Sequence, residues 1–216
     1  SVKSRGLGDV YKRQISSGIV PAGMEIMDKA LIEATDNFSK AGYPRDAELL
    51  LIVELDGTDS EVNELIKKVE AICKKNNCSS LKLSNSEKER LSFWAGRKAA
   101  FPACGAMAPD YYCMDGSIPR GKLTEALLEI KKLSEKYKFP VANCFHAGDG
   151  NLHPLIMFDG NDKEQRRKTE EFGSEILKTC VRLGGVITGE HGVGIDKREL
   201  MCEMFNDNDI QQQLSI

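Results

Sequence analysis

Apolar positions along this chain follow helical spacing in some segments and continuous or alternating runs in others. Helical spacing predicts helices at 21–41, 59–73, 90–100, 123–137 and 162–183. The apolar runs predict strands at 48–55, 79–83 and 111–114. Strands that alternate with helices in this way indicate an α+β fold, with an antiparallel sheet flanked by helices.

A β-hairpin is expected between residues 141 and 158, because a Gly-Asp-Gly-Asn core separates two apolar stretches. Asp149-Gly150 would supply the left-handed positions of a two-residue turn. In that register His146 lies directly opposite His153, on the same face and with Cβ atoms roughly 4.5–5.5 Å apart. Two imidazoles that converge in this way can share one metal ion.

All three histidines of the chain lie in two glycine-rich segments, and the second segment also carries a carboxylate. Glu190 can add a third ligand to His146 and His153, which leaves an open position of the kind found in catalytic metal sites. His191 follows Glu190 directly, so both side chains need not bind the ion. A free imidazole beside a metal is a natural general base.

Other charged or polar residues have simpler interpretations when only their spacing is considered. Arg97 and Lys98 are typical of a solvated helix face, and Asp149 and Asn151 are typical turn formers. The charged run 196–198 is equally typical of an ordinary helix start.

Composition excludes some classes of function. The net charge is −3, with 41% apolar and 29% charged residues, so a nucleic-acid partner is not expected. The chain has no apolar run near the roughly 20 residues that span a bilayer, and no signal core at its start. A soluble, intracellular protein is therefore expected.

The seven cysteines are scattered and odd in number, with no Cys-x-x-Cys pair. This pattern favours reduced thiols over a disulfide framework, a zinc ribbon or an iron–sulfur site. Cys144 lies two residues before His146 and so on the same strand face, where packing is the favoured role.

Four motifs together resemble the C-terminal cap domain of FAD-linked oxidases, a family that includes glycolate oxidase flavin subunits and D-lactate and D-2-hydroxyglutarate dehydrogenases. These motifs occupy residues 93–98, 109–119, 146–154 and 185–197. The resemblance implies a ferredoxin-like α+β cap domain at 15–209 and an N-terminal FAD-binding domain outside this chain. Residues 1–14 are interpreted as a non-native segment, and 210–216 as a divergent or truncated tail.

The resemblance also implies roles for the site residues. FAD would accept hydride from a small 2-hydroxy acid, and a divalent zinc, iron or manganese ion would bind the substrate hydroxyl. The implied metal ligands are His146, His153 and Glu190. His191 would be the catalytic base, Arg97 would bind the substrate carboxylate, and Lys98 is a weaker candidate for the same task.

The resemblance further implies partners and a location. The expected partners are the FAD-binding domain of the same parent protein and other oxidase subunits. The expected location is the cytoplasm, with partner subunits able to bring the protein to a membrane.

Two other functions are alternatives to the FAD-linked oxidase interpretation. A metal-dependent hydrolase could use the same two histidines and glutamate to activate water, but the sequence has no His-Glu-x-x-His arrangement. A non-catalytic metal-binding module is the third interpretation.

Overall fold

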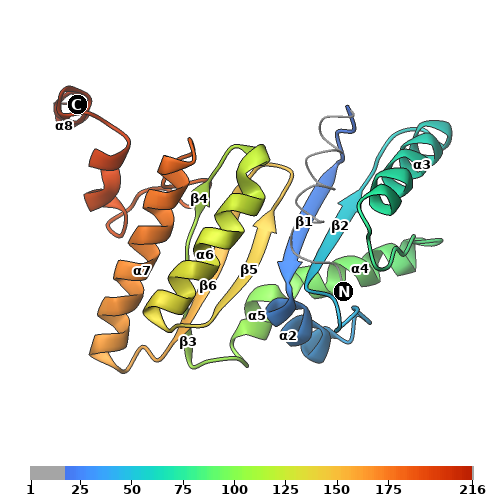
Figure 1. Cartoon of the computed structure of the whole chain (residues 1–216), viewed down its shortest axis with the longest axis horizontal. Helices are drawn as coiled ribbons and strands as arrows, with labels where there is room; N and C mark the ends of the chain where they lie inside the picture. The colour runs from blue at the N-terminus through green and yellow to red at the C-terminus, as the bar shows by residue number, and fades with distance from the viewer. Residues whose placement is uncertain (1–17, 216) are drawn as a thin grey trace.

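Residues 18–215 are described in a computed structural model, in which an antiparallel sheet lies between helices (Figure 1). The strand order is β2-β1-β5-β6-β3, and β4 pairs with β6. The strands are β1 (Gly23–Asp28), β2 (Leu49–Glu54), β3 (Asp110–Cys113), β4 (Gly116–Ser117), β5 (Val141–His146) and β6 (Asn151–Phe158). All named strand pairs are antiparallel, so the predicted α+β fold class is confirmed.

The helices cover both faces of this sheet (Figure 1). They are α2 (Lys29–Ser39), α3 (Asp59–Lys75), α4 (Glu87–Lys98), α5 (Ala100–Cys104), α6 (Leu123–Tyr137), α7 (Lys163–Arg182) and α8 (Asp207–Leu214), with short 3-10 helices η1 (Arg120–Lys122) and η2 (Arg198–Glu203). The predictions for α3, α6 and α7 are confirmed. Within the described residues, no helix is both long and apolar enough to cross a bilayer.

Each face of the sheet has its own apolar cluster, because successive residues of a strand point to opposite faces. Phe145 and Ile156 pack with residues of α6 and α7 on one face. Cys144 and Leu155 pack with residues of α2 and α5 on the other face. The two central strands are therefore buried on both sides, and His146 shares the face of Cys144.

The first element differs from the sequence prediction, because 21–41 is a strand followed by a helix. Strand β1 lies between β2 and β5 and is buried on both faces, so its apolar residues do not alternate. A strand of only six residues with this pattern cannot be distinguished from a helical pattern by periodicity. The Asp28 carboxylate accepts a hydrogen bond from the Leu31 N–H and caps α2, which is the local signal for the boundary.

The strand predicted at 79–83 is also wrong, because this segment has no regular secondary structure. An alternating pattern becomes a strand only when it pairs with another strand, and this segment does not pair with the edge strand β2. Here the segment and β2 line a cavity of about 670 Å³. Leu81 and Leu83 remain 42% and 40% exposed.

All seven cysteines are free thiols, as predicted. Burial raises the pKa of Cys104, Cys144 and Cys180 to about 12, whereas Cys202 is exposed. We therefore expect Cys202 to react first with a thiol reagent at pH 8, and these three buried thiols to react only on unfolding. Mass spectrometry of the labelled peptides checks this order, and rapid labelling of Cys144 in the native chain would contradict it.

Candidate metal centre

The hairpin that carries two of the histidines has a longer turn than predicted. His146 pairs with Asn151, and Cys144 pairs with His153, so residues 147–150 form a four-residue loop. The predicted turn is wrong because it needs positive φ at both central residues, and only Gly150 has it (φ 80°). The shift moves the partner of His146 by two residues, so both histidines stay on one face, with ring centroids 5.0 Å apart.

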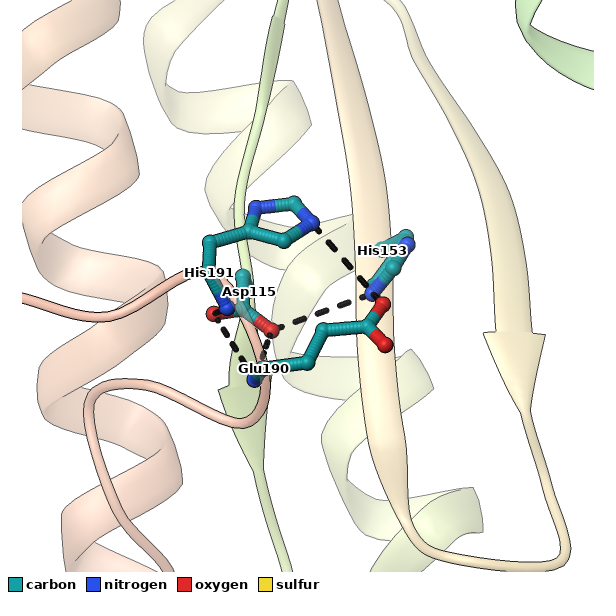
Figure 2. A group of neighbouring side chains, drawn as sticks. All are labelled: Asp115, His153, Glu190 and His191. Carbon is teal, nitrogen blue, oxygen red and sulfur yellow. Dashed lines mark hydrogen bonds and ion pairs between the residues drawn. The ribbon is translucent and has the colours of Figure 1, made fainter.

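Glu190 brings the three imidazoles together. Its Oε1 lies 3.0 Å from Nε2 of His153, 3.7 Å from Nε2 of His146 and 3.8 Å from Nε2 of His191. Figure 2 shows the Glu190 side chain reaching from its loop toward His153 on β6. One carboxylate oxygen surrounded by three ring nitrogens is a donor set suited to a divalent transition metal.

His153 is the most buried of these groups, at 2% exposed. Its Nδ1 has no hydrogen-bond partner among the described residues, and the 3.0 Å contact of its Nε2 with Glu190 Oε1 lacks hydrogen-bond geometry. Burial and the nearby His146 lower the pKa of His153 to about 4, so the ring is neutral at physiological pH. A buried neutral imidazole without a hydrogen bond fits a metal ligand, because a bound ion would satisfy the polar atom.

His146 is held by a carboxylate that the sequence analysis did not identify. Its Nδ1 lies 2.8 Å from Oε1 of Glu25 on β1, and this hydrogen bond raises the pKa of His146. Glu25 is in turn held by Arg97, whose Nε and Nη2 both lie 2.9 Å from Oε2. A carboxylate at Nδ1 favours the tautomer in which Nε2 keeps its lone pair for a metal.

Asp115 is the second residue that the sequence analysis did not identify. Asp115, His153, Glu190 and His191 form a group whose ligand atoms all lie within 4.8 Å of one another (Figure 2). His146 lies outside that group. Although burial raises the pKa of Asp115, hydrogen bonds from the His191 N–H and the Lys197 ammonium hold it well below its usual range.

The interpretation of 196–198 as an ordinary charged helix start does not describe Lys197. This side chain is 7% exposed, and its Nζ lies 3.0 Å from Oδ2 of Asp115. Burying an ammonium group is costly without such a partner.

Comparison with known proteins now assigns a family. Residues 6–214 match the profile of the family described as FAD linked oxidases, C-terminal domain. The chain belongs to this family. The resemblance inferred from the four motifs is thereby confirmed, whereas the limits of this FAD-linked oxidase domain at 15 and 209 stay predictions. The interpretation of residues 1–14 concerns residues outside those that the structure describes.

Curated relatives of this FAD-linked oxidase domain include glycolate oxidase subunits. It is 50% identical over 212 residues to the glycolate oxidase subunit GlcD of Escherichia coli (strain K12). The alignment covers 97% of this chain and 42% of GlcD. It is 32% identical over 195 residues to the mitochondrial D-lactate dehydrogenase (cytochrome) of Arabidopsis thaliana, covering 89% of this chain and 34% of that protein. The chain thus spans less than half the length of these relatives.

Solved structures support the fold of the FAD-linked oxidase domain. The chain aligns with a 4-ethylphenol oxidase from Gulosibacter chungangensis with a TM-score of 0.64, covering 95% of this chain and 47% of that one. A p-cresol methylhydroxylase aligns with a TM-score of 0.61, covering 96% and 45%. At 12% identity in both cases, these alignments bear on the fold alone.

The remaining predicted residues lie at different distances from this centre. Arg97 contacts it through Glu25, whereas Lys98 is exposed at the end of α4 and makes no ion pair within residues 18–215. Asn151 begins β6 and donates a hydrogen bond to Asp115. Cys144 is fully buried in an apolar cluster, in agreement with a packing role.

Glu25 holds His146 in place, and this leads to a prediction. Glu25→Gln should lower divalent-metal affinity by roughly 10–100-fold, the usual effect of losing an outer partner of a ligand. It should also destabilise the fold by about 3 kcal/mol, because the buried Arg97 loses its counter-charge. Metal titration and urea unfolding measure the two effects.

Glu54→Gln is the matched control for this substitution. Glu54, at the end of β2 beside β1, pairs with Arg90 of α4, but these side chains are 32% and 40% exposed. Its loss should cost at most about 1 kcal/mol and leave metal affinity unchanged. Wild-type metal affinity in Glu25→Gln would show that Glu25 does not support the centre.

Proposed function

We propose that this chain is the substrate- and metal-binding domain of an FAD-dependent dehydrogenase or oxidase of short 2-hydroxy acids. The observation that carries the proposal is the convergence of three imidazoles on Glu190 Oε1, around a His153 ring that lacks a hydrogen-bond partner. The printed names of the relatives agree with it, since glycolate and D-lactate are both 2-hydroxy acids.

His146, His153 and Glu190 are the metal ligands in this proposal. The Glu25 contact supports His146 in that role, because it leaves Nε2 available, and burial supports His153. A bound zinc, iron or manganese ion would supply Lewis-acid polarisation of the substrate hydroxyl, and FAD would supply the hydride acceptor.

His191 is the base in this proposal. Its side chain is 45% exposed, so substrate can approach it, and its Nε2 lies 3.8 Å from Glu190 Oε1 at the edge of the centre. We assign removal of the substrate hydroxyl proton to this nitrogen, which leaves C2 ready to release its hydride as the 2-oxo acid forms.

Arg97 is assigned to the substrate carboxylate. Glu25 engages its Nε and Nη2, so Nη1 is the donor that we assign to the substrate. Lys98, at the exposed end of the same helix, is a second and weaker candidate. The remaining partners are proposals from family membership: a flavin-binding domain in the same parent protein and further oxidase subunits.

Flavin reduction tests this function. The full-length flavoprotein that contains this domain is mixed anaerobically with glycolate or D-lactate, and the flavin absorbance near 450 nm is followed. Bleaching is expected with at least one 2-hydroxy acid and not with acetate, which lacks the hydroxyl. A flavin that stays oxidised with every short 2-hydroxy acid would refute the proposal.

A further inference from the structure

We propose that Asp115 and Lys197 are positioning residues that hold segment 188–191 in the conformation that brings Glu190 and His191 to the metal centre. Asp115 is not itself a ligand in this proposal. The proposal concerns the same site as the proposed function. It depends on that function only in the experiment that measures metal binding.

The Asp115 carboxylate is fully buried, and its Oδ2 accepts hydrogen bonds from several residues of the segment. This oxygen lies 2.8 Å from Oγ1 of Thr188, 3.1 Å from N of Gly189 and 2.9 Å from N of His191. It also lies 3.0 Å from Nζ of Lys197. One oxygen therefore contacts both ends of a segment that has no strand or helix of its own.

The other carboxylate oxygen joins the segment to the sheet. Oδ1 of Asp115 accepts the Glu190 N–H at 3.1 Å and the Asn151 side-chain amide at 3.1 Å. Asn151 begins β6, the strand that carries His153. The two ligands on separate segments are thus positioned relative to each other by one carboxylate.

These contacts argue against direct ligation by Asp115. A carboxylate offers about four acceptor sites, and Asp115 already accepts from backbone, amide, hydroxyl and ammonium donors. Its Oδ1 is 3.8 Å from His153 Nε2, farther than the 3.0 Å of Glu190 Oε1. An ion could bind Asp115 only by displacing donors that define the loop.

Lys197 completes the arrangement by matching the charge of Asp115. Its Nζ lies 3.0 Å from Asp115 Oδ2, 3.1 Å from Thr188 Oγ1 and 3.3 Å from the Asp115 carbonyl oxygen. An ammonium group has three donors, and three acceptors surround this one. Gly189 permits the close approach, because a Cβ there would lie 2.2 Å from Nδ2 of Asn151.

Amide hydrogen exchange of the metal-free chain is the first test. Asp115→Asn should raise exchange at Glu190 and His191 at least tenfold, because an amide cannot accept from all these donors. Gly189 should change less, because its N–H also donates to the Asp115 backbone carbonyl at 2.9 Å. Ile130→Ala is the control, since Ile130 is buried in an apolar cluster and its loss destabilises the fold without removing any hydrogen bond of Asp115. Unchanged protection of the Glu190 and His191 amides in Asp115→Asn would overturn the proposal.

Cobalt(II) titration of the same chain is the second test. Asp115→Asn should weaken Co²⁺ binding by roughly 10–100-fold, with the visible spectrum of the bound ion unchanged because the ligands are the same. A changed spectrum would make Asp115 a ligand, and wild-type affinity would remove its positioning role. Either result overturns the proposal.

Lys197→Met gives the same readouts in a second variant, and it decides the question if Asp115→Asn does not fold. It removes the ammonium but leaves the carboxylate, so smaller changes in the same directions are expected. Wild-type amide exchange in Lys197→Met would then overturn the proposal.

Failure of the wild-type chain to bind Co²⁺ would count against the proposed metal function, whereas the amide exchange result would still decide the role of Asp115.

Discussion

His153→Ala is expected to remove the divalent metal, with a loss of affinity beyond the roughly 10–100-fold typical of an outer partner. His153 is the most buried imidazole of the centre and lies closest to Glu190, at 3.0 Å. Its Nε2 makes no hydrogen bond among the described residues, so a bound ion would supply the partner that this buried nitrogen lacks. Elemental analysis after dialysis measures the metal content of the two proteins.

Cys144→Ala is the matched control for this experiment. Cys144 lies directly opposite His153 on the neighbouring strand and is likewise buried. If Cys144 only packs, its removal costs stability but not metal. Full metal content in His153→Ala would end the ligand assignment, and metal loss in Cys144→Ala would reopen ligation by sulfur.

His191→Gln is expected to slow flavin reduction by roughly 10²–10⁴-fold in the full-length flavoprotein, the usual contribution of a positioned base. Metal content should remain within about twofold of wild type, because His191 is not a ligand in the proposed set. Stopped-flow absorbance measures the reduction rate, and elemental analysis of the same sample measures the metal.

The comparison variant for His191→Gln is His146→Ala. His191 lies in the tight group with Asp115, His153 and Glu190, and His146 does not, so membership of that group would favour His191 as the ligand. The Glu25 contact favours His146 instead. Loss of metal in His191→Gln with metal retained in His146→Ala would reverse the two roles.

The shared face of His146 and His153 could be predicted although the turn between them was wrong. Side chains on a strand repeat every two residues, so a register error of two leaves the face unchanged, whereas an error of one would have separated the rings. The two imidazoles therefore converge in any register that differs from the predicted one by an even number of residues. The loop length depended on the φ angle of Asp149, which sequence spacing does not determine.

Glu25 and Asp115 could not be found by the same reasoning, because their partners are remote in sequence. Glu25 is 121 residues from His146, and Asp115 is 75 residues from Glu190. Local periodicity carries no information about such pairs. The available signal was indirect: a carboxylate within an apolar strand needs a buried partner, and Glu25 stands between Met24 and Ile26.

The interactions around Glu190 also bear on how the chain folds. The groups that meet there span positions 25 to 191, and closing such long loops costs entropy before any contact compensates for it. A chain in which β1 has not joined β5 lacks the carboxylate that holds His146. At the proposed site, metal affinity would therefore report complete folding, because it requires the first strand and the segment near residue 190 to be in place together.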